Sequence, residues 1–425
     1  MSQAQLVLIS FLGLFAVHFV LERALSVINM RHIHANPQVP SPLKDVIPIE
    51  AYERSIEYAA VRTRFGHVRA AATAAITLIY LFSGFLPWLS SAAERLPGGD
   101  LTQGVFVFAV FEFLLICVTL VFDIYSTFWI EARFGFNQTD VKTFCLDFLK
   151  QMLLAVILFV PLLYALLAFV SRSGPLWWLW AALFLAAFQF VMMIVAPRFI
   201  APLFNKFTPL GQGELRDRVE ALARQCGFAM HGVFVMDGSK RSAHSNAYFT
   251  GIGASRRIVL YDTLIQQMSV PEVGAVLAHE IGHFKRKHIV KALLLGLFLL
   301  FAGAYTLSLL IKWPPFFQAF GVDGGLANGR QAAISLVLLS LVGGSFLFWL
   351  GPLFHKLSRK HEYEADAYAA QQTDAHHMES ALLKLSEKNL STMTPHPLYS
   401  AYHYSHPTLL ERINALRSCA GATLK

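Results

Sequence analysis

Residues 279–283 read His-Glu-Ile-Gly-His, a spacing that can hold a catalytic metal ion. Positions four apart lie on one face of a helix, so His279 and His283 can both reach one zinc ion. Glu280 then lies beside the open position of the metal, where a water molecule would bind, and it can act as the base for that water. The sequence therefore predicts one zinc ion per chain, with Glu280 as a catalytic residue.

A zinc protease needs three protein ligands. The candidate for the third ligand lies about 80 residues further along the chain than the two histidines. Residues 358–367 read Ser-Arg-Lys-His-Glu-Tyr-Glu-Ala-Asp-Ala. Glu362 and Asp366 share a helix face, so we expect Glu362 to bind the metal and Asp366 to hydrogen-bond a ligand histidine. Glu364 falls on another face. Helix acids are usually solvated surface groups, and the paired histidines are what favour a ligand here.

A basic cluster follows the motif. His288 comes five residues after His283, a position turned away from the ligand face of a continuous helix. With Lys285, Arg286 and Lys287 it is expected to mark the cytoplasmic start of a membrane helix and to anchor it at the interface.

The composition predicts a membrane protein. Of the 425 residues, 55% are hydrophobic and only 15% are charged, more apolar surface than a soluble fold can bury. The net charge of +8 could suggest a nucleic-acid partner. Basic residues also gather on the cytoplasmic side of membrane proteins, so we expect a lipid bilayer and no nucleic acid.

Seven apolar stretches are long enough to cross a bilayer of roughly 30 Å. They lie near 5–29, 70–92, 104–128, 150–172, 176–203, 288–312 and 331–356. The chain therefore divides into a region with five spans (1–203), a polar segment with the HExxH motif (204–287), two further spans (288–356) and a polar segment with the third ligand (357–425).

Loop charges predict the orientation in the membrane. Basic residues such as Arg54, Arg133 and Lys360 concentrate after the first, third, fifth and seventh spans and are sparse in the intervening loops. By the positive-inside rule the N-terminus lies outside, and both polar segments, with the active site, lie in the cytoplasm.

The two polar segments differ in their predicted structure. The first reads as a helix over 213–226, a strand over 233–236, a hairpin of 247–251 with 257–261, and a helix that begins at Val270 and carries the motif. In the second, helices are expected near 357–372, 376–390 and 407–418.

These motifs together resemble the CAAX prenyl proteases of the Ste24 type, integral membrane zinc metalloproteases of the M48 class. The resemblance rests on residues 135–137, 239–249, 279–285, 362–367 and 403–412, and the number of spans matches. It implies a mainly α fold in which seven transmembrane helices enclose a water-filled chamber, with a cytoplasmic zincin-like α+β metalloprotease domain. His18, Glu112 and Asp123, costly against lipid, are expected to face that interior, or else to lie at span ends or pair between helices.

The resemblance also gives roles to residues outside the metal motif. Asn246, Ala247, Tyr248 and Phe249 resemble the edge strand that holds the substrate backbone by β-addition, with Asn246 bonding the peptide beside the scissile bond.

His406 and Arg412 resemble the pair that supports the metal site. His406 is expected to stabilise the oxyanion of the tetrahedral intermediate, and Arg412 to orient Glu362 or the substrate.

The implied reaction is peptide hydrolysis after a prenylated cysteine, which releases a C-terminal tripeptide, with activity on unprenylated peptides as well. The chain ends Ala-Thr-Leu-Lys without an evident retrieval signal, which favours a bacterial cytoplasmic membrane over the endoplasmic reticulum. Quality control of membrane proteins is an alternative of the same class. A transporter or receptor with a structural HExxH motif is another, but no symmetry between two halves supports it. The sequence does not indicate an oligomeric state.

Overall fold

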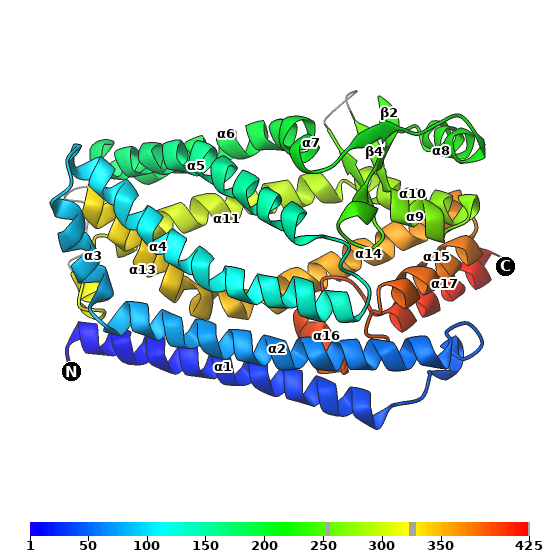
Figure 1. Ribbon diagram of the computed structural model, residues 1–425, viewed down its shortest axis with the longest axis horizontal. Helices are drawn as coiled ribbons and strands as arrows, with labels where there is room; N and C mark the ends of the chain where they lie inside the picture. The colour runs from blue at the N-terminus through cyan, green and yellow to red at the C-terminus, as the bar shows by residue number, and fades with distance from the viewer. Residues whose placement is uncertain (252–255, 323–328, 424–425) are drawn as a thin grey trace.

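The computed structural model describes residues 1–251, 256–322 and 329–423. Its long helices run along one axis of an elongated molecule, and a small sheet lies at one end (Figure 1). The N-terminus lies at the opposite end from the sheet (Figure 1). The predicted mainly helical fold is confirmed.

Within the described residues, seven helical segments are long and apolar enough to cross a membrane, as predicted. They are built from α1 (Gln3–Ala35), α2 (Ile49–Phe82), α4 (Gly99–Tyr125), α5 (Val141–Arg172), α6 (Trp177–Val195) with α7 (Ala201–Phe204), α11 (His288–Leu310), and α13 (Gly329–Leu347) with α14 (Gly351–Gln372). Phe113, Phe159 and Phe298 on these helices are each more than 60% exposed. Exposed apolar surface of this kind is typical of proteins that contact a membrane.

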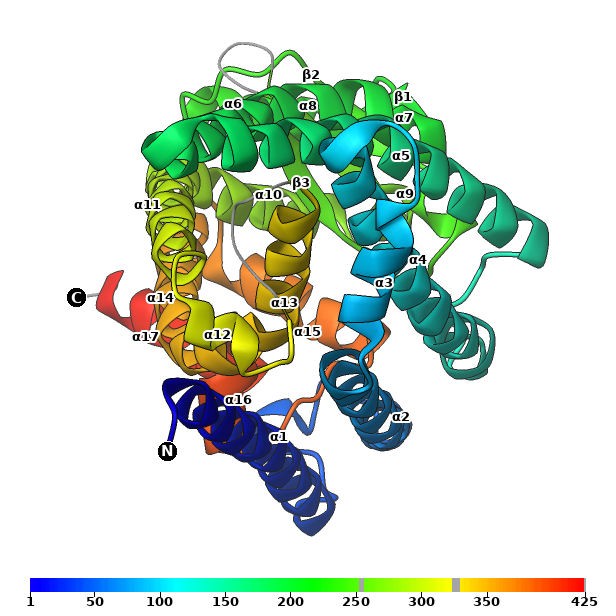
Figure 2. The same cartoon turned by 90° about the vertical axis from the view of Figure 1, so that its left-hand side faces the viewer.

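The membrane helices follow one another around the long axis. In the end-on view α1, α2, α4, α5, α6 and α11 lie toward the outside, and α13 lies further in (Figure 2). Helix α13 is correspondingly the most buried, with Ala332, Ala333 and Leu338 wholly inside the protein. The water-filled chamber stays a prediction.

The second span differs from its prediction near 70–92. Helix α2 ends at Phe82, and a separate helix α3 (Phe85–Glu94) follows. The break lies at Gly84, whose φ of +77° is accessible to glycine at little cost. Helix α2 also begins earlier than expected, so Arg54 lies on this helix and not in a loop.

The first polar segment, 204–287, forms a four-stranded sheet in the order β1-β2-β4-β3. Its strands are β1 (Phe207–Pro209), β2 (Gly232–Met236), β3 (Ala247–Thr250) and β4 (Arg257–Tyr261). The predicted hairpin of β3 and β4 is antiparallel, β2 and β4 are parallel, and the unpredicted β1 pairs antiparallel with β2. Strand β3 is last in the order and has one edge without a strand partner among the described residues.

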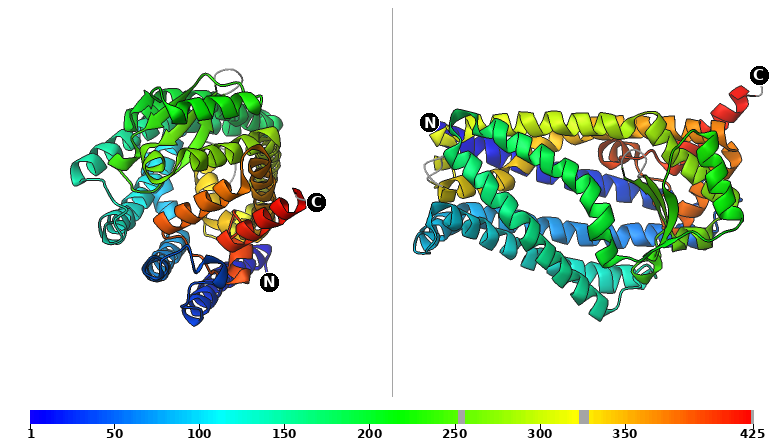
Figure 3. Two further views of the ribbon diagram at one scale, coloured as in Figure 1. Left: turned by 90° about the vertical axis from the view of Figure 1, so that its right-hand side faces the viewer. Right: turned by 90° about the horizontal axis from the view of Figure 1, so that it is seen from above.

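Helices from both polar segments meet at the sheet end of the molecule (Figure 3). They are α8 (Glu214–Gln225), α9 (Asp262–Gln267), α10 (Val270–Lys285), α15 (Ala375–Lys388), α16 (Pro397–His403) and α17 (Leu409–Thr423); a short helix, α12 (Pro314–Gln318), lies elsewhere. Helix α16 was not predicted. Val273, Leu277 and Ile281 of α10 share one apolar core with Leu260 of β4 and Ile413 of α17, which fixes α10 between sheet and C-terminal helices.

The start of α10 is held by Glu272. Its carboxylate accepts hydrogen bonds from the backbone N–H and hydroxyl of Ser269, which form a capping box with it. It also accepts from the Ser380 hydroxyl at 2.6 Å and the Lys384 ammonium at 2.7 Å. Burial alone would raise the pKa of Glu272, but these hydrogen bonds lower it to about 2. One carboxylate therefore ties α15 to the helix that carries the motif.

We expect Glu272→Gln to lower the free energy of unfolding by about 1–3 kcal/mol, because Lys384 and Ser380 lose a charged acceptor. The melting temperature of the purified protein should fall accordingly. The pKa is depressed in the folded state, so the carboxylate stabilises the fold at pH values above the ordinary glutamate pKa and loses this effect as the pH falls toward 2. The difference in melting temperature between this variant and the wild type should therefore be smaller at pH 4 than at pH 6. Glu220→Gln, in a helix-surface pair with Arg216, is the control and should change little; an equal effect of both variants would contradict the account.

Candidate metal centre

Helices α10 and α14 approach each other closely at Gly282, the fourth residue of the motif. A Cβ atom at this position would lie 3.1 Å from the Cα of Ala365 and 3.2 Å from the Cβ of Tyr368. The two backbones are therefore separated by little more than van der Waals contact. This approach is what brings Glu362, one turn before Ala365 on α14, to the histidines of α10.

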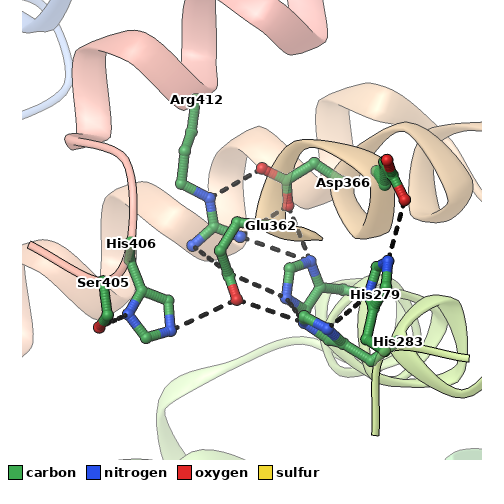
Figure 4. Close-up of polar contacts among 9 residues, drawn as sticks. His279, His283, Glu362, Asp366, Ser405, His406 and Arg412 are labelled. Atoms are coloured by element: carbon green, nitrogen blue, oxygen red, sulfur yellow. Dashed lines mark hydrogen bonds and ion pairs between the residues drawn. The ribbon is translucent and has the colours of Figure 1, made fainter. Parts of the chain in front are cut away.

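Three side chains converge at this crossing (Figure 4). The Nε2 atoms of His279 and His283 lie 3.2 Å apart. The Oε2 of Glu362 lies 3.5 Å from Nε2 of His279, and its Oε1 lies 3.4 Å from Nε2 of His283. Within the described part of the chain, these three residues form the group that could hold a metal ion, with ligand atoms all within 4.8 Å of one another.

The chemistry of this group fits a divalent metal. The Oε2 of Glu362 is buried and has no hydrogen-bond partner among the described residues. The two facing Nε2 atoms can share at most one proton, and a cation between them would interact with both lone pairs and with the carboxylate. Two imidazoles and one carboxylate are a ligand set that suits zinc.

Asp366 and Arg412 complete the arrangement on the side of His279. The Oδ1 of Asp366 lies 2.8 Å from Nδ1 of His279. The guanidinium of Arg412 donates to both oxygens of Asp366, at 2.8 and 2.6 Å, and lies 3.8 Å from Oε2 of Glu362. Burial lowers the pKa of His279, but its contacts with Asp366 and Glu362 outweigh this and raise the pKa to about 9. The surroundings of this imidazole thus favour a positive partner, either a proton or a metal cation.

Glu280 lies next to His279 on α10 and is half-buried. Burial raises the pKa of its carboxyl, while the nearby histidines oppose the shift. A carboxylate with a raised pKa is a stronger base than an ordinary carboxylate, which suits it to accept a proton from water.

His406 lies in the loop before α17 and approaches Glu362 from the side opposite His279 (Figure 4). Its Nε2 lies 3.5 Å from Oε1 of Glu362, and its Nδ1 lies 3.0 Å from the hydroxyl of Ser405. Its side chain is 64% exposed. It also lines a cavity of about 410 Å³ that includes Arg412. His406 is thus more exposed than the proposed ligands His279, His283 and Glu362, and it can meet an incoming molecule.

The predicted substrate strand coincides with β3, the strand with the free edge. The Tyr261 N–H donates to the carbonyl of Asn246 at 3.1 Å. Backbone groups alternate along an antiparallel strand, so those of Asn246 and Tyr248 face β4 and those of Ala247 and Phe249 face the free edge. The side chain of Asn246 is exposed, and its Oδ1 accepts from the outward N–H of Ala247 at 2.8 Å.

His288 and Glu364 were not expected at the site. His288 does begin α11, but it is only 4% exposed. Its Nδ1 lies 3.0 Å from Nδ1 of His283, and its Nε2 lies 3.0 Å from Oε2 of Glu364. The prediction treated 279–288 as one helix, whereas α10 ends at Lys285 and Lys287 has a left-handed φ of +58°. This turn brings His288 back beside the motif.

Substituting Gly282 should separate α14 from α10 and weaken metal binding. We expect Gly282→Val to reduce zinc affinity about tenfold or more, because displacing a ligand should cost at least as much as removing a partner that orients one. Gly282→Ala should have a smaller effect of the same sign. The measurement is competition with a chelator of known zinc affinity.

Gly296→Ala on α11 is the matched control, since a Cβ there meets nothing within 4 Å. Alanine favours helix over glycine by about 1 kcal/mol, so this control should keep both metal affinity and stability. Unchanged zinc affinity in Gly282→Val would show that the close approach does not set the site.

Two family models together match most of the chain. Residues 29–206 match the CAAX prenyl protease N-terminal region, described as five membrane helices, and residues 209–420 match peptidase family M48.

Proteins similar over nearly their whole length carry names of the same kind. A CAAX prenyl protease 1 homolog of Oryza sativa subsp. japonica is 38% identical over 390 residues, covering 89% of this chain and 90% of that protein. CAAX prenyl protease 1 of Saccharomyces cerevisiae is 37% identical, covering 89% and 88%. The Homo sapiens homolog is 32% identical, covering 89% of each.

The fold is similar to the crystal structure of S. mikatae Ste24p. The TM-score is 0.91 at 33% identity, covering 98% of this chain and 99% of that chain. The resemblance inferred from the sequence motifs is confirmed.

Proposed function

The chain belongs to peptidase family M48 and is a multi-pass membrane metalloprotease, and we propose that its metal is a single zinc ion held by His279, His283 and Glu362. The observation that carries the proposal is the convergence of three ligand atoms around a buried carboxylate oxygen without a hydrogen-bond partner. Zinc, when bound there, would supply a Lewis acid that acidifies a water molecule and polarises a peptide carbonyl.

The proton transfers fall to Glu280. Its carboxylate takes a proton from the attacking water and then gives it to the amine of the leaving peptide. Burial raises the pKa of this carboxyl, which makes its carboxylate a stronger base for the first transfer.

His406 and Arg412 are proposed to act on opposite sides of Glu362. The exposed imidazole of His406 can donate to the oxyanion that forms on the substrate carbonyl. The buried guanidinium of Arg412 holds Asp366 and lies within ion-pair distance of Glu362. Arg412 thus orients the carboxylates of α14, and through Asp366 it orients His279.

Peptide substrates are proposed to add to the free edge of β3. The outward backbone groups of Ala247 and Phe249 supply the donors and acceptors for an extended chain. The Oδ1 of Asn246 accepts the hydrogen bond of the outward Ala247 N–H. When a substrate adds to the edge, Asn246 would give up this hydrogen bond and form one to the substrate. Tyr248 and Phe249 hold the strand in place: Phe249 packs on the core and Tyr248 stands beside Tyr261.

The proposed substrates are proteins that end in a prenylated CAAX sequence, from which a C-terminal tripeptide is removed. The names of the related proteins support this class. The distribution of basic residues supports an orientation with the N-terminus outside and the site in the cytoplasm. A bacterial cytoplasmic membrane stays a prediction from the sequence.

Glu280→Gln should retain zinc and lose about 10²–10⁴-fold in turnover, because the amide keeps the shape of the side chain but cannot take a proton. His283→Ala should lose both the metal and the activity. Zinc content by metal analysis and cleavage of one fluorogenic peptide, measured on the same preparations, check both expectations. Full activity of Glu280→Gln would remove this residue from the reaction.

Matched prenylated and unprenylated peptides, with product masses, test the substrate class. We expect cleavage directly after the modified cysteine, release of a tripeptide, and inhibition by a chelator that added zinc reverses. Scattered cuts without regard to the cysteine would favour the quality-control alternative. Absence of any chelator-sensitive cleavage would contradict the proposed function.

A further inference from the structure

A row of hydrogen bonds runs outward from His283, away from the metal position. The Nδ1 of His283 meets Nδ1 of His288 at 3.0 Å, and Nε2 of His288 meets Oε2 of Glu364 at 3.0 Å. His288 is almost fully buried, and the ring of His361 stacks on it at a centroid distance of 4.0 Å. Contacts on both ring nitrogens and one ring face thus hold His288 in a single orientation.

The directions of these hydrogen bonds follow from the groups involved. An ionised carboxylate only accepts, so Nε2 of His288 donates its proton to Glu364. A neutral imidazole has one N–H, which leaves Nδ1 of His288 as an acceptor. The proton between the two Nδ1 atoms must then belong to His283. This leaves the lone pair of His283 on Nε2, the atom that faces His279 and Glu362.

The same reasoning applies to His279, which contacts a carboxylate without an intervening residue. Nδ1 of His279 contacts Asp366 directly, so the neutral imidazole that binds a metal carries its proton on Nδ1 and its lone pair on Nε2. Helix α14 thus supplies a metal-facing carboxylate, Glu362, and two carboxylates that orient the histidines. Asp366 orients His279 directly, and Glu364 orients His283 through His288.

We propose that His288 and Glu364 are positioning residues of the metal centre, which fix the tautomer and the ring orientation of His283. The inference rests on the proposed function, in which His283 is a zinc ligand. His288 itself is not among the converging ligand atoms of the described residues, and its Nδ1 is engaged by His283. Residues that orient a ligand in this way contribute about 10–100-fold to metal affinity.

The experiment measures the apparent zinc dissociation constant of purified full-length variants by chelator competition. His288→Phe should weaken zinc binding about 10–100-fold, and Glu364→Gln should weaken it by a smaller factor. Because Glu364 acts through His288, the double variant should bind zinc no more weakly than His288→Phe alone. His288→Gln, whose amide offers an NH₂ donor group and a carbonyl acceptor, should recover part of the lost affinity.

Lys360→Gln is the matched control for the charge at Glu364. Lys360 lies 3.8 Å from the other oxygen of Glu364 and is 72% exposed, so its loss should leave zinc affinity within about twofold, as for surface ion pairs. If His288→Phe does not fold, the comparison of Glu364→Gln with this control still tests the inference. Glu364 is partly exposed, so its substitution should be tolerated by the fold.

Two results would overturn the inference: zinc affinity within about twofold of wild type in both single variants, or a double variant whose loss equals the product of the two single losses. Wild-type zinc affinity in His283→Ala would instead overturn the proposed function, because it would remove His283 from the ligands. The two failures are therefore distinguishable on one set of preparations.

Discussion

The close approach of α10 and α14 at Gly282 is the constraint on which the site depends. Without a side chain at this position, α14 lies against α10, and the three carboxylates 362, 364 and 366 come within reach of the histidines. Helix α14 continues the last membrane span within a 44-residue helical segment. The membrane region and the metal centre thus share one structural element, so the geometry of the site is tied to the packing of the span.

Buried charge is the second feature that organises the site. Glu362, Asp366 and Arg412 have side chains no more than 12% exposed, and His279 lies among them. Such charges are tolerated inside a protein only when each has partners. The guanidinium of Arg412 donates two hydrogen bonds to Asp366 but lies 3.8 Å from the carboxylate of Glu362. Glu362 therefore receives less from Arg412 than Asp366 does, and a metal cation between the two histidines would be a further partner for it.

The parts of the site that follow from helix periodicity could be predicted from the sequence. Residues four apart share a face, so the pairs His279–His283 and Glu362–Asp366 followed once the helices were recognised. His288 and Glu364 could not be placed this way, because their approach depends on a non-glycine residue, Lys287, in a left-handed conformation. The bend at Gly84 and the short helix α16 likewise depend on local turns that apolar periodicity does not reveal.

The central claim is that two imidazoles and one carboxylate hold a zinc ion at the crossing of α10 and α14. X-ray absorption at the zinc edge of the purified protein tests it most directly. We predict one zinc per chain, a nearest shell of nitrogen and oxygen at about 2.0–2.1 Å, and the outer-shell scattering of two imidazole rings. A sulfur shell at about 2.3 Å, or a protein without zinc after purification in its presence, would contradict the account.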